Sequence, residues 1–152
     1  MENYRKRFIV LGTGTSVGIA IIKTLASRCG VLFACFRSIQ EFRKQKKCLK
    51  LLEKYKSIRV CIIPDDGDQT FLRYLGNLRR YSVVVEGVIC MSDWKPDRLF
   101  QSIRPLLRDK GRFIAVGKPM MLLPEDVIAK ERGITTYSFS NANAPILIEN
   151  VL

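Results

Sequence analysis

Residues 8–18 read Phe8-Ile9-Val10-Leu11-Gly12-Thr13-Gly14-Thr15-Ser16-Val17-Gly18. A short apolar run, typical of a buried strand, leads directly into three glycines spaced as Gly-x-Gly-x-x-x-Gly. From Val17 onward, apolar or small residues recur at i, i+3, i+4, i+7 and i+8, a spacing that predicts a helix with one buried face. The stretch therefore predicts a strand, a tight turn and a helix in direct succession.

Each glycine of this turn has a separate physical use. Gly12 permits the tight turn, Gly14 lets the backbone approach a diphosphate, and Gly18 lets the helix pack closely on the strand. The start of the helix would present N–H groups and a partial positive charge to an anion. We expect the turn to bind a dinucleotide, the alternative being a turn that only closes the fold. The expected contact residues are Gly12, Thr13, Gly14, Thr15, Ser16, Val17 and Gly18.

Apolar runs rich in Val, Ile and Phe alternate with helix-like stretches along the rest of the chain. They predict six strands, at Phe8–Leu11, Val31–Phe36, Arg59–Ile63, Ser82–Cys90, Arg112–Val116 and Ile134–Phe139. Continuous apolar runs are typical of parallel strands covered on both faces. We therefore predict an α/β fold, a Rossmann-type doubly wound parallel sheet, as one dinucleotide-binding domain over residues 1–152.

Helix boundaries are less sharply marked. The apolar residues from Ile39 to Leu52 predict a second helix whose lysines face water. Pro96 and Asp97 predict the start of a later helix that Gly111 would end. A short helix is expected near Pro124 and a last one from about Ala144.

The end of the second predicted strand bears on the choice of nucleotide. NAD-preferring sites commonly place Asp or Glu there to bind the ribose 2′-hydroxyl, whereas this strand ends Phe36-Arg37-Ser38. Arg37 can pair with a 2′-phosphate through its planar fork and Ser38 can donate a hydroxyl, although Arg37 could instead simply face solvent. NADPH is accordingly the expected cofactor.

Several classes of site are excluded or disfavoured by composition. The chain has no histidine, which removes Ser-His-Asp triads, Cys-His pairs and His-ligated metals. The five cysteines form no Cys-x-x-Cys and are expected to be reduced core thiols. The Asp65–Asp68 turn lacks the Glu of a calcium loop, so no metal site is expected.

Trp94 follows the fourth strand and would either form a wall of the nicotinamide pocket or anchor a loop.

The net charge of +12 is concentrated near the start of the chain. Residues 1–60 carry 14 Lys or Arg against 3 Asp or Glu, and residues 61–152 carry 12 against 11. Much of the excess lies between Arg43 and Lys56, which could be a nucleic-acid stripe, a solvated helix face or an attractant for an acidic partner. With few interleaved aromatics, the segment is not expected to bind nucleic acid sequence-specifically. No long apolar run or leader-like start is evident, so a cytoplasmic protein without membrane attachment is expected.

Three segments resemble the nucleotide-binding half of the enoyl reductase domains of fatty acid and polyketide synthases, in the medium-chain dehydrogenase/reductase superfamily. The first is the glycine turn with its helix. The second, and most specific, is Leu99–Leu107 followed by Lys110-Gly111-Arg112-Phe113 and Gly117-Lys118. The third is Pro124–Ala129 followed by Gly133-Ile134 and Phe139. The Tyr-x-x-x-Lys pair of short-chain dehydrogenases is absent.

This resemblance implies an activity and its residues. Gly117 would lie beside the nicotinamide, and Lys118 would protonate the substrate carbon after hydride transfer. It further implies an acyl thioester substrate or an acidic acyl carrier protein as partner, together with a separate substrate domain in cis or in trans. A homodimer is one alternative for the oligomeric state, which the sequence leaves open.

Some positions depart from that family. Ser140 stands where a second acid is expected, and Glu41 stands where a lysine for the 2′-phosphate is expected. We predict an NADPH-binding domain of an enoyl reductase that does not turn over as the isolated chain, because one domain provides only half of a substrate pocket. The alternative is a non-catalytic Rossmann scaffold or nucleotide sensor.

Overall fold

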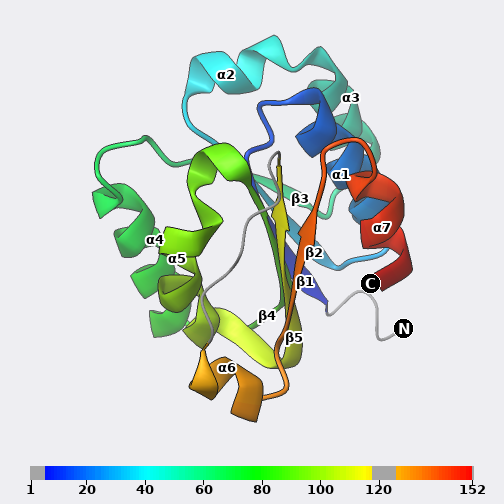
Figure 1. The fold of residues 1–152 in the computed structure, drawn as a ribbon. Helices are drawn as coiled ribbons and strands as arrows, with labels where there is room; N and C mark the ends of the chain where they lie inside the picture. The colour runs from blue at the N-terminus through cyan, green and yellow to red at the C-terminus, as the bar shows by residue number, and fades with distance from the viewer. Residues whose placement is uncertain (1–5, 118–125, 152) are drawn as a thin grey trace.

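The computed structural model describes residues 6–117 and 126–151, which form one six-stranded parallel sheet between two layers of helices (Figure 1). The strand order is β3-β2-β1-β4-β5-β6. The strands are β1 (Arg7–Leu11), β2 (Val31–Phe36), β3 (Ile58–Ile62), β4 (Val85–Met91), β5 (Leu107–Val116) and β6 (Thr135–Phe139). The order reverses direction between β1 and β4, as in doubly wound nucleotide-binding folds, so the predicted Rossmann-type architecture is confirmed.

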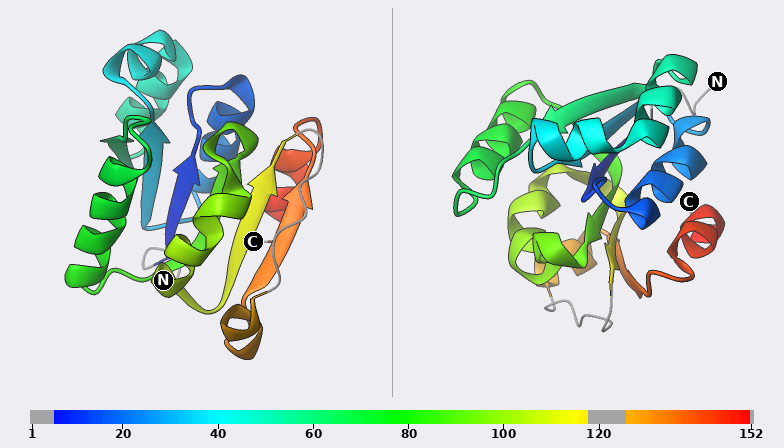
Figure 2. Two further views of the ribbon diagram at one scale, coloured as in Figure 1. Left: turned by 60° about the vertical axis from the view of Figure 1, so that its left-hand side comes forward. Right: turned by 90° about the horizontal axis from the view of Figure 1, so that it is seen from above.

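The helices divide between the two faces of the sheet. One side carries α1 (Ser16–Ala26), α3 (Lys46–Lys54) and α7 (Ala144–Val151), and the other carries α4 (Gln69–Arg80) and α5 (Pro96–Ile103) (Figures 1 and 2). The short α2 (Ile39–Lys44) lies above the carboxyl ends of the strands, and α6 (Val127–Glu131) lies at the opposite end (Figure 1). The carboxyl edge is where ligands bind in such sheets.

Burial follows the predicted pattern closely in the central strands. Residues 8–11 of β1 are all buried, as are residues 87–91 of β4 and 113–116 of β5. Strands covered on both faces bury both sets of alternating side chains, which explains their continuous apolar sequence. Within the described ranges, no helix is long and apolar enough to cross a membrane.

Two helix predictions are wrong, one in where a helix ends and one in the number of helices. The helix that starts at Pro96 ends at Ile103 and continues only as a 3-10 turn, Arg104–Leu106, so Gly111 does not end it. Gly111 lies inside β5, where an added Cβ would approach the Arg108 carbonyl oxygen to 2.7 Å. The second predicted helix is two helices, α2 and α3, which meet at Gln45.

Candidate nucleotide site

The glycine turn lies at the point where the strand order reverses. Gly12 follows β1 with a φ of +106°, a left-handed conformation that glycine adopts without strain. A Cβ at Gly12 would lie 2.4 Å from Cγ of Met91, the last residue of β4. The turn therefore packs directly against β4, the strand next to β1 where the strand order reverses.

The turn is attached to β2 through one carbonyl. The Cys35 carbonyl accepts hydrogen bonds from Gly12 N at 3.3 Å and from Thr13 N at 3.2 Å. It also accepts one from the Thr13 hydroxyl at 2.8 Å. Thr13 is completely buried, so this bond satisfies a hydroxyl that has lost its contact with water. The three bonds fix the turn relative to the second strand.

The start of α1 is capped by the turn itself. Thr15 is the N-cap residue, and its hydroxyl accepts a hydrogen bond from Gly18 N at 3.0 Å. Ser16 is exposed and Val17 packs at the rim of the core. A Cβ on Gly18 would come within 2.4 Å of the Gly12 carbonyl oxygen, which explains the close approach of helix and turn. Ser16 and Val17 begin the helix, where N–H groups have no intrahelical acceptor.

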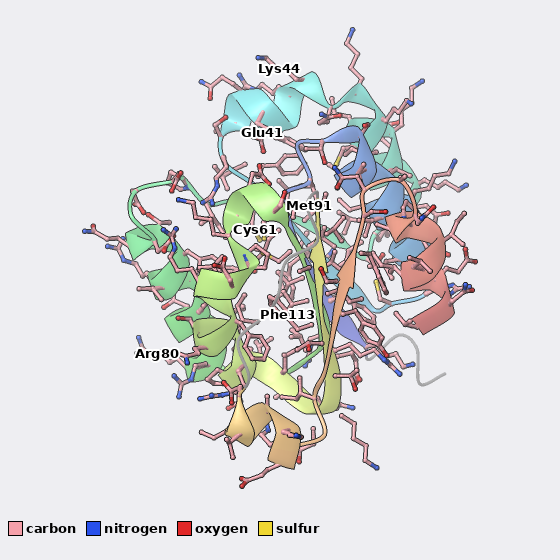
Figure 3. The ribbon with its side chains drawn as sticks, in the orientation of Figure 1. Glu41, Lys44, Cys61, Arg80, Met91 and Phe113 are labelled. Atoms are coloured by element: carbon pink, nitrogen blue, oxygen red, sulfur yellow. The ribbon has the colours of Figure 1, made fainter. Side chains whose placement is uncertain are left out.

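Glu41 occupies the space next to Gly14. Its carboxyl carbon lies 2.3 Å from the position that a Cβ on Gly14 would take, and its Oε1 accepts a hydrogen bond from Arg37 N at 3.1 Å. The side chain descends from α2 toward the turn (Figure 3). The predicted role of Gly14 was close backbone approach to a diphosphate, and in this structure a carboxylate makes the approach instead.

Gln45 fixes the junction of α2 and α3 to the same turn. Its Nε2 donates to the Gly14 carbonyl at 2.6 Å. Phe42 in α2 also packs edge-to-face on Phe36 at the end of β2, with ring centroids 5.1 Å apart. Sequence reasoning did not identify Glu41 or Gln45 as turn contacts, since no periodicity signals a contact across 27 or more residues.

Arg37 does not simply face solvent. Its guanidinium lies 3.6 Å from the centroid of the Trp94 ring and its Nη1 donates to the Ile63 carbonyl at 3.5 Å. Trp94 is buried and contacts Phe71 edge-to-face at 6.3 Å, so it anchors its loop and supports Arg37. Ser38 is the N-cap of α2 and accepts from Glu41 N at 3.0 Å. An accepting hydroxyl still has a proton to donate.

The nicotinamide end of the predicted site is described in part. Gly117 follows β5, is buried and donates its N–H to the Phe139 carbonyl at 3.0 Å. A Cβ there would lie 2.3 Å from Cβ of Ser92, which follows β4. Lys118, the predicted proton donor, lies outside the described residues. The structure thus brings Gly12, Met91, Ser92 and Gly117 to one edge of the sheet.

A basic groove runs along the flank of α1, starting beside the glycine turn at Ser16 and Gln45. It encloses about 650 Å³ between α1 and the α2–α3 segment. We call it the lysine groove; its lining residues are Ser16, Ile19, Ala20, Lys23, Lys44, Gln45, Lys46, Lys47, Lys50 and Leu51. No carboxylate is among them. The lysines predicted to face water on the second helix therefore border a hollow together with one from α1.

No histidine, cysteine, aspartate or glutamate cluster suited to a metal ion occurs among residues 6–117 and 126–151. In the Asp65–Asp68 turn, Asp66 instead accepts from the N–H and hydroxyl of Thr70, in the first turn of α4. These hydrogen bonds lower the pKa of the Asp66 carboxyl.

No protein-family model matches the sequence, and a search of characterised proteins finds no significant match. Solved structures share the fold at low identity. BdcA in complex with NADPH aligns with a TM-score of 0.62 and 11% identity over 86% of this chain and 68% of that one. LugOII, a promiscuous reductase that catalyses keto-reduction at C1 during lugdunomycin biosynthesis, aligns at 0.71 and 14% over 99% and 90%.

A short-chain dehydrogenase from Burkholderia cenocepacia J2315, in complex with NADP, aligns at 0.52 with 15% identity over 77% of this chain and 57% of that one. The fold is thus that of Rossmann-type reductases, several of which were crystallised with NADPH or NADP. The likeness is to that wider group, and it does not extend specifically to the enoyl reductase domains expected from the sequence.

Proposed function

We propose that this chain binds NADPH at the glycine turn and acts as the nucleotide-binding half of an enoyl-acyl thioester reductase. The observation that carries the cofactor assignment is the turn itself, since Gly12, Thr13 and Gly18 are held at the switch point by the Cys35 carbonyl and the Thr15 cap. Anions bind at such helix starts because free N–H groups and the helix dipole point at them.

The residues present fit a phosphorylated dinucleotide with one adjustment. Arg37 lies beyond the end of β2, on a rigid aromatic support, and Ser38 retains a hydroxyl proton. A 2′-phosphate would gain a charge-assisted contact from the planar guanidinium. The diphosphate would require Glu41 to leave Gly14, because a carboxylate and a diphosphate repel each other at short range.

The enoyl reductase assignment rests on the segment that follows α5. Residues 112–116 lie in β5 and Gly117 lies at its carboxyl end beside Ser92, the edge where a nicotinamide is held in such folds. When bound, the cofactor supplies the hydride. Lys118, next in sequence, is proposed to give a proton to the α-carbon of the substrate, which is general acid catalysis by a lysine.

The acyl chain requires walls that this domain does not supply. A pocket for such a substrate lies between two domains, and the described residues form one sheet with its helices. We infer that a substrate domain completes the site, in cis or in trans. An acidic acyl carrier protein is the proposed partner at the lysine groove, whose lining residues include five lysines and no acidic residue.

The test is calorimetry with NADPH and NADH on the isolated chain. We expect NADPH to bind more tightly, and no heat with either nucleotide at millimolar concentration would contradict the proposal.

For catalysis, NADPH absorbance is followed with a crotonyl thioester, with and without substrate-domain protein from a related synthase. The lone chain should show no turnover. Turnover that disappears with Lys118→Ala would show that one domain suffices.

A second candidate function follows from Glu41. A carboxylate packed on Gly14 suits a Rossmann scaffold that has ceased to bind nucleotide. The two candidates are separated by repeating the calorimetry on Glu41→Gln. Binding by the wild type favours the reductase, whereas absence of binding by both proteins favours the scaffold.

A further inference from the structure

Two cysteines lie side by side on β2 and β3, the two strands at one edge of the sheet. Cys35 on β2 and Cys61 on β3 are register partners in the parallel pairing. Register partners on neighbouring strands point to the same face and are separated by about 4.8 Å, the strand spacing. A disulfide joins Cα atoms about 4.4–6.8 Å apart, so the backbone already satisfies this requirement.

The two thiols differ in access to solvent. Strand β3 is the edge of the sheet, and Cys61 is partly exposed there, on the face that α4 covers (Figure 3). Its Sγ lies 3.5 Å from the Tyr74 hydroxyl of α4. Cys35 is one strand inward and completely buried. A small oxidant arriving from solvent would therefore meet Cys61 first.

The surroundings also separate their acidities. A hydrogen bond from the Cys35 thiol lowers the pKa of Cys61 to about 7, burial opposes this, and the Tyr74 hydroxyl lowers it further. Burial raises the pKa of Cys35 well above its ordinary range. Since the thiolate is the nucleophile, Cys61 is the reactive member and Cys35 the protonated neighbour.

We propose that Cys35 and Cys61 form a dithiol site that peroxides oxidise to a cross-strand disulfide. The Cys61 thiolate attacks one oxygen of a hydroperoxide and breaks the O–O bond, which gives a sulfenic acid and, after protonation, water or an alcohol. The Cys35 sulfur then attacks the Cys61 sulfur, loses its proton, and displaces hydroxide, which leaves as water. Overall, two thiols lose two electrons and two protons, and the peroxide gains both.

Formation of the disulfide should shift the residues that hold the glycine turn. Disulfides favour Cβ atoms about 3.8 Å apart, closer than the strand spacing, so the new bond must draw the two residues together. The Cys35 carbonyl holds Gly12 and Thr13, and Ile63, two residues after Cys61, holds Arg37 through its own carbonyl. We expect the disulfide to weaken nucleotide binding several-fold, and this second effect rests on the proposed function.

The first experiment needs no nucleotide. Reduced protein is treated with hydrogen peroxide, remaining thiols are alkylated, and intact and peptide masses are measured. The expected product has lost two hydrogens and joins the Cys35 and Cys61 peptides, with Cys29, Cys48 and Cys90 still alkylated after denaturation. A disulfide elsewhere, or oxidation of Cys48 as fast as that of Cys61, would overturn the proposal.

Variants sharpen the assignment. Cys35→Ser should stop at a sulfenic acid on Cys61 that dimedone traps, Cys61→Ser should remain reduced, and Cys48→Ser, a buried thiol on α3, should behave as wild type. Disulfide formation in wild type does not depend on whether these variants fold.

The effect on nucleotide binding is measured separately, by calorimetry with NADPH on the oxidised and the reduced wild type. If reduced protein binds no nucleotide, only the reductase proposal fails, and if no disulfide forms, only the dithiol proposal fails.

Discussion

The carboxylate of Glu41 lies against Gly14, with Oε1 2.4 Å from the position that a Cβ would fill. The same oxygen accepts the Arg37 N–H, so α2, the end of β2 and the glycine turn meet at one side chain. A negative charge thus stands where the fold would place a diphosphate.

We expect Glu41→Gln to raise NADPH affinity by about tenfold, because it removes a charge at short range while an amide oxygen can keep the Arg37 contact. Isothermal titration of both proteins measures this. Glu53→Gln on α3 is the matched control, since that glutamate is exposed and outside the turn. Equal affinities of wild type and Glu41→Gln would mean that the carboxylate already leaves Gly14 at no cost.

Arg37→Ala should reduce affinity for NADPH by about 1–3 kcal/mol and change affinity for NADH much less, because only NADPH carries the phosphate that the guanidinium would bind. Arg43→Ala, on the exposed side of α2, should leave both unchanged. The Trp94 contact gives Arg37 a structural part as well. Urea unfolding is therefore measured alongside, and equal losses for both nucleotides would assign Arg37 to stability alone.

Alanine at the second and third glycines of the turn should have unequal effects on the free energy of unfolding. At Gly18 the added Cβ meets backbone, 2.4 Å from the Gly12 carbonyl oxygen, and the expected loss is about 1–3 kcal/mol. The helix preference for Ala, about 1 kcal/mol, acts in the opposite sense. At Gly14 the Cβ meets the movable Glu41 side chain, and the expected loss is below about 1 kcal/mol. Urea denaturation that ranked them the other way would contradict the described packing.

Alkylation of Cys61 should depend on pH with a midpoint near 7. Its pKa is lowered from the ordinary value of 9.0, chiefly by the Cys35 hydrogen bond, so its thiolate forms as pH rises through 7 and the rate levels off above 8. Burial raises the pKa of Cys48 to about 11, so its rate should still be rising at pH 9. Peptide-resolved iodoacetamide kinetics distinguish them. A Cys61 midpoint near 9 would contradict the described contacts.

Loss of the α6 cap should be measurable as well. Asp126 accepts from Ala129 N at 3.0 Å and forms an ion pair with Arg104. Asp126→Ala should lower the free energy of unfolding by about 1 kcal/mol, the usual effect of removing an N-cap acceptor. The neighbouring exposed Glu131→Ala is the control, and thermal unfolding of both is compared with wild type. Equal midpoints for all three proteins would show that neither the cap nor the ion pair with Arg104 adds stability.

The sequence predicted the sheet well because strand burial is a local signal. Val31–Phe36 was predicted to the residue, and the other strands were located within a few residues except at the start of β5. The break at Gln45 was missed because its side chain bonds the Gly14 carbonyl, 31 residues away, and no local pattern marks such a contact. Gly111 was misplaced because a glycine after a helical pattern looks like a helix end. Its true place is in β5 next to Lys110, which has a φ of +64°, where the register between β4 and β5 shifts, and no local pattern marks that irregularity.

The position of the glycine turn could be predicted from glycine spacing, whereas the contacts that surround the turn depend on packing and could not. The turn residues and Arg37 lie at the expected edge of the sheet. Met91 and Ser92 contact Gly12 and Gly117 only because β4 lies between β1 and β5, a relationship set by strand order. No single segment of the sequence marks that order, so these two contacts could not be predicted.

The attachment of the turn through the Cys35 carbonyl has a bearing on how the chain can vary. A main-chain oxygen is present whatever side chain the residue carries, so substitutions at position 35 leave the acceptor itself in place. The hydrogen bonds that hold the turn therefore do not involve the side chain of residue 35. A cysteine at position 35 can take part in thiol chemistry while its main-chain carbonyl still holds the turn. The thiol can therefore be gained or lost in evolution without loss of these hydrogen bonds.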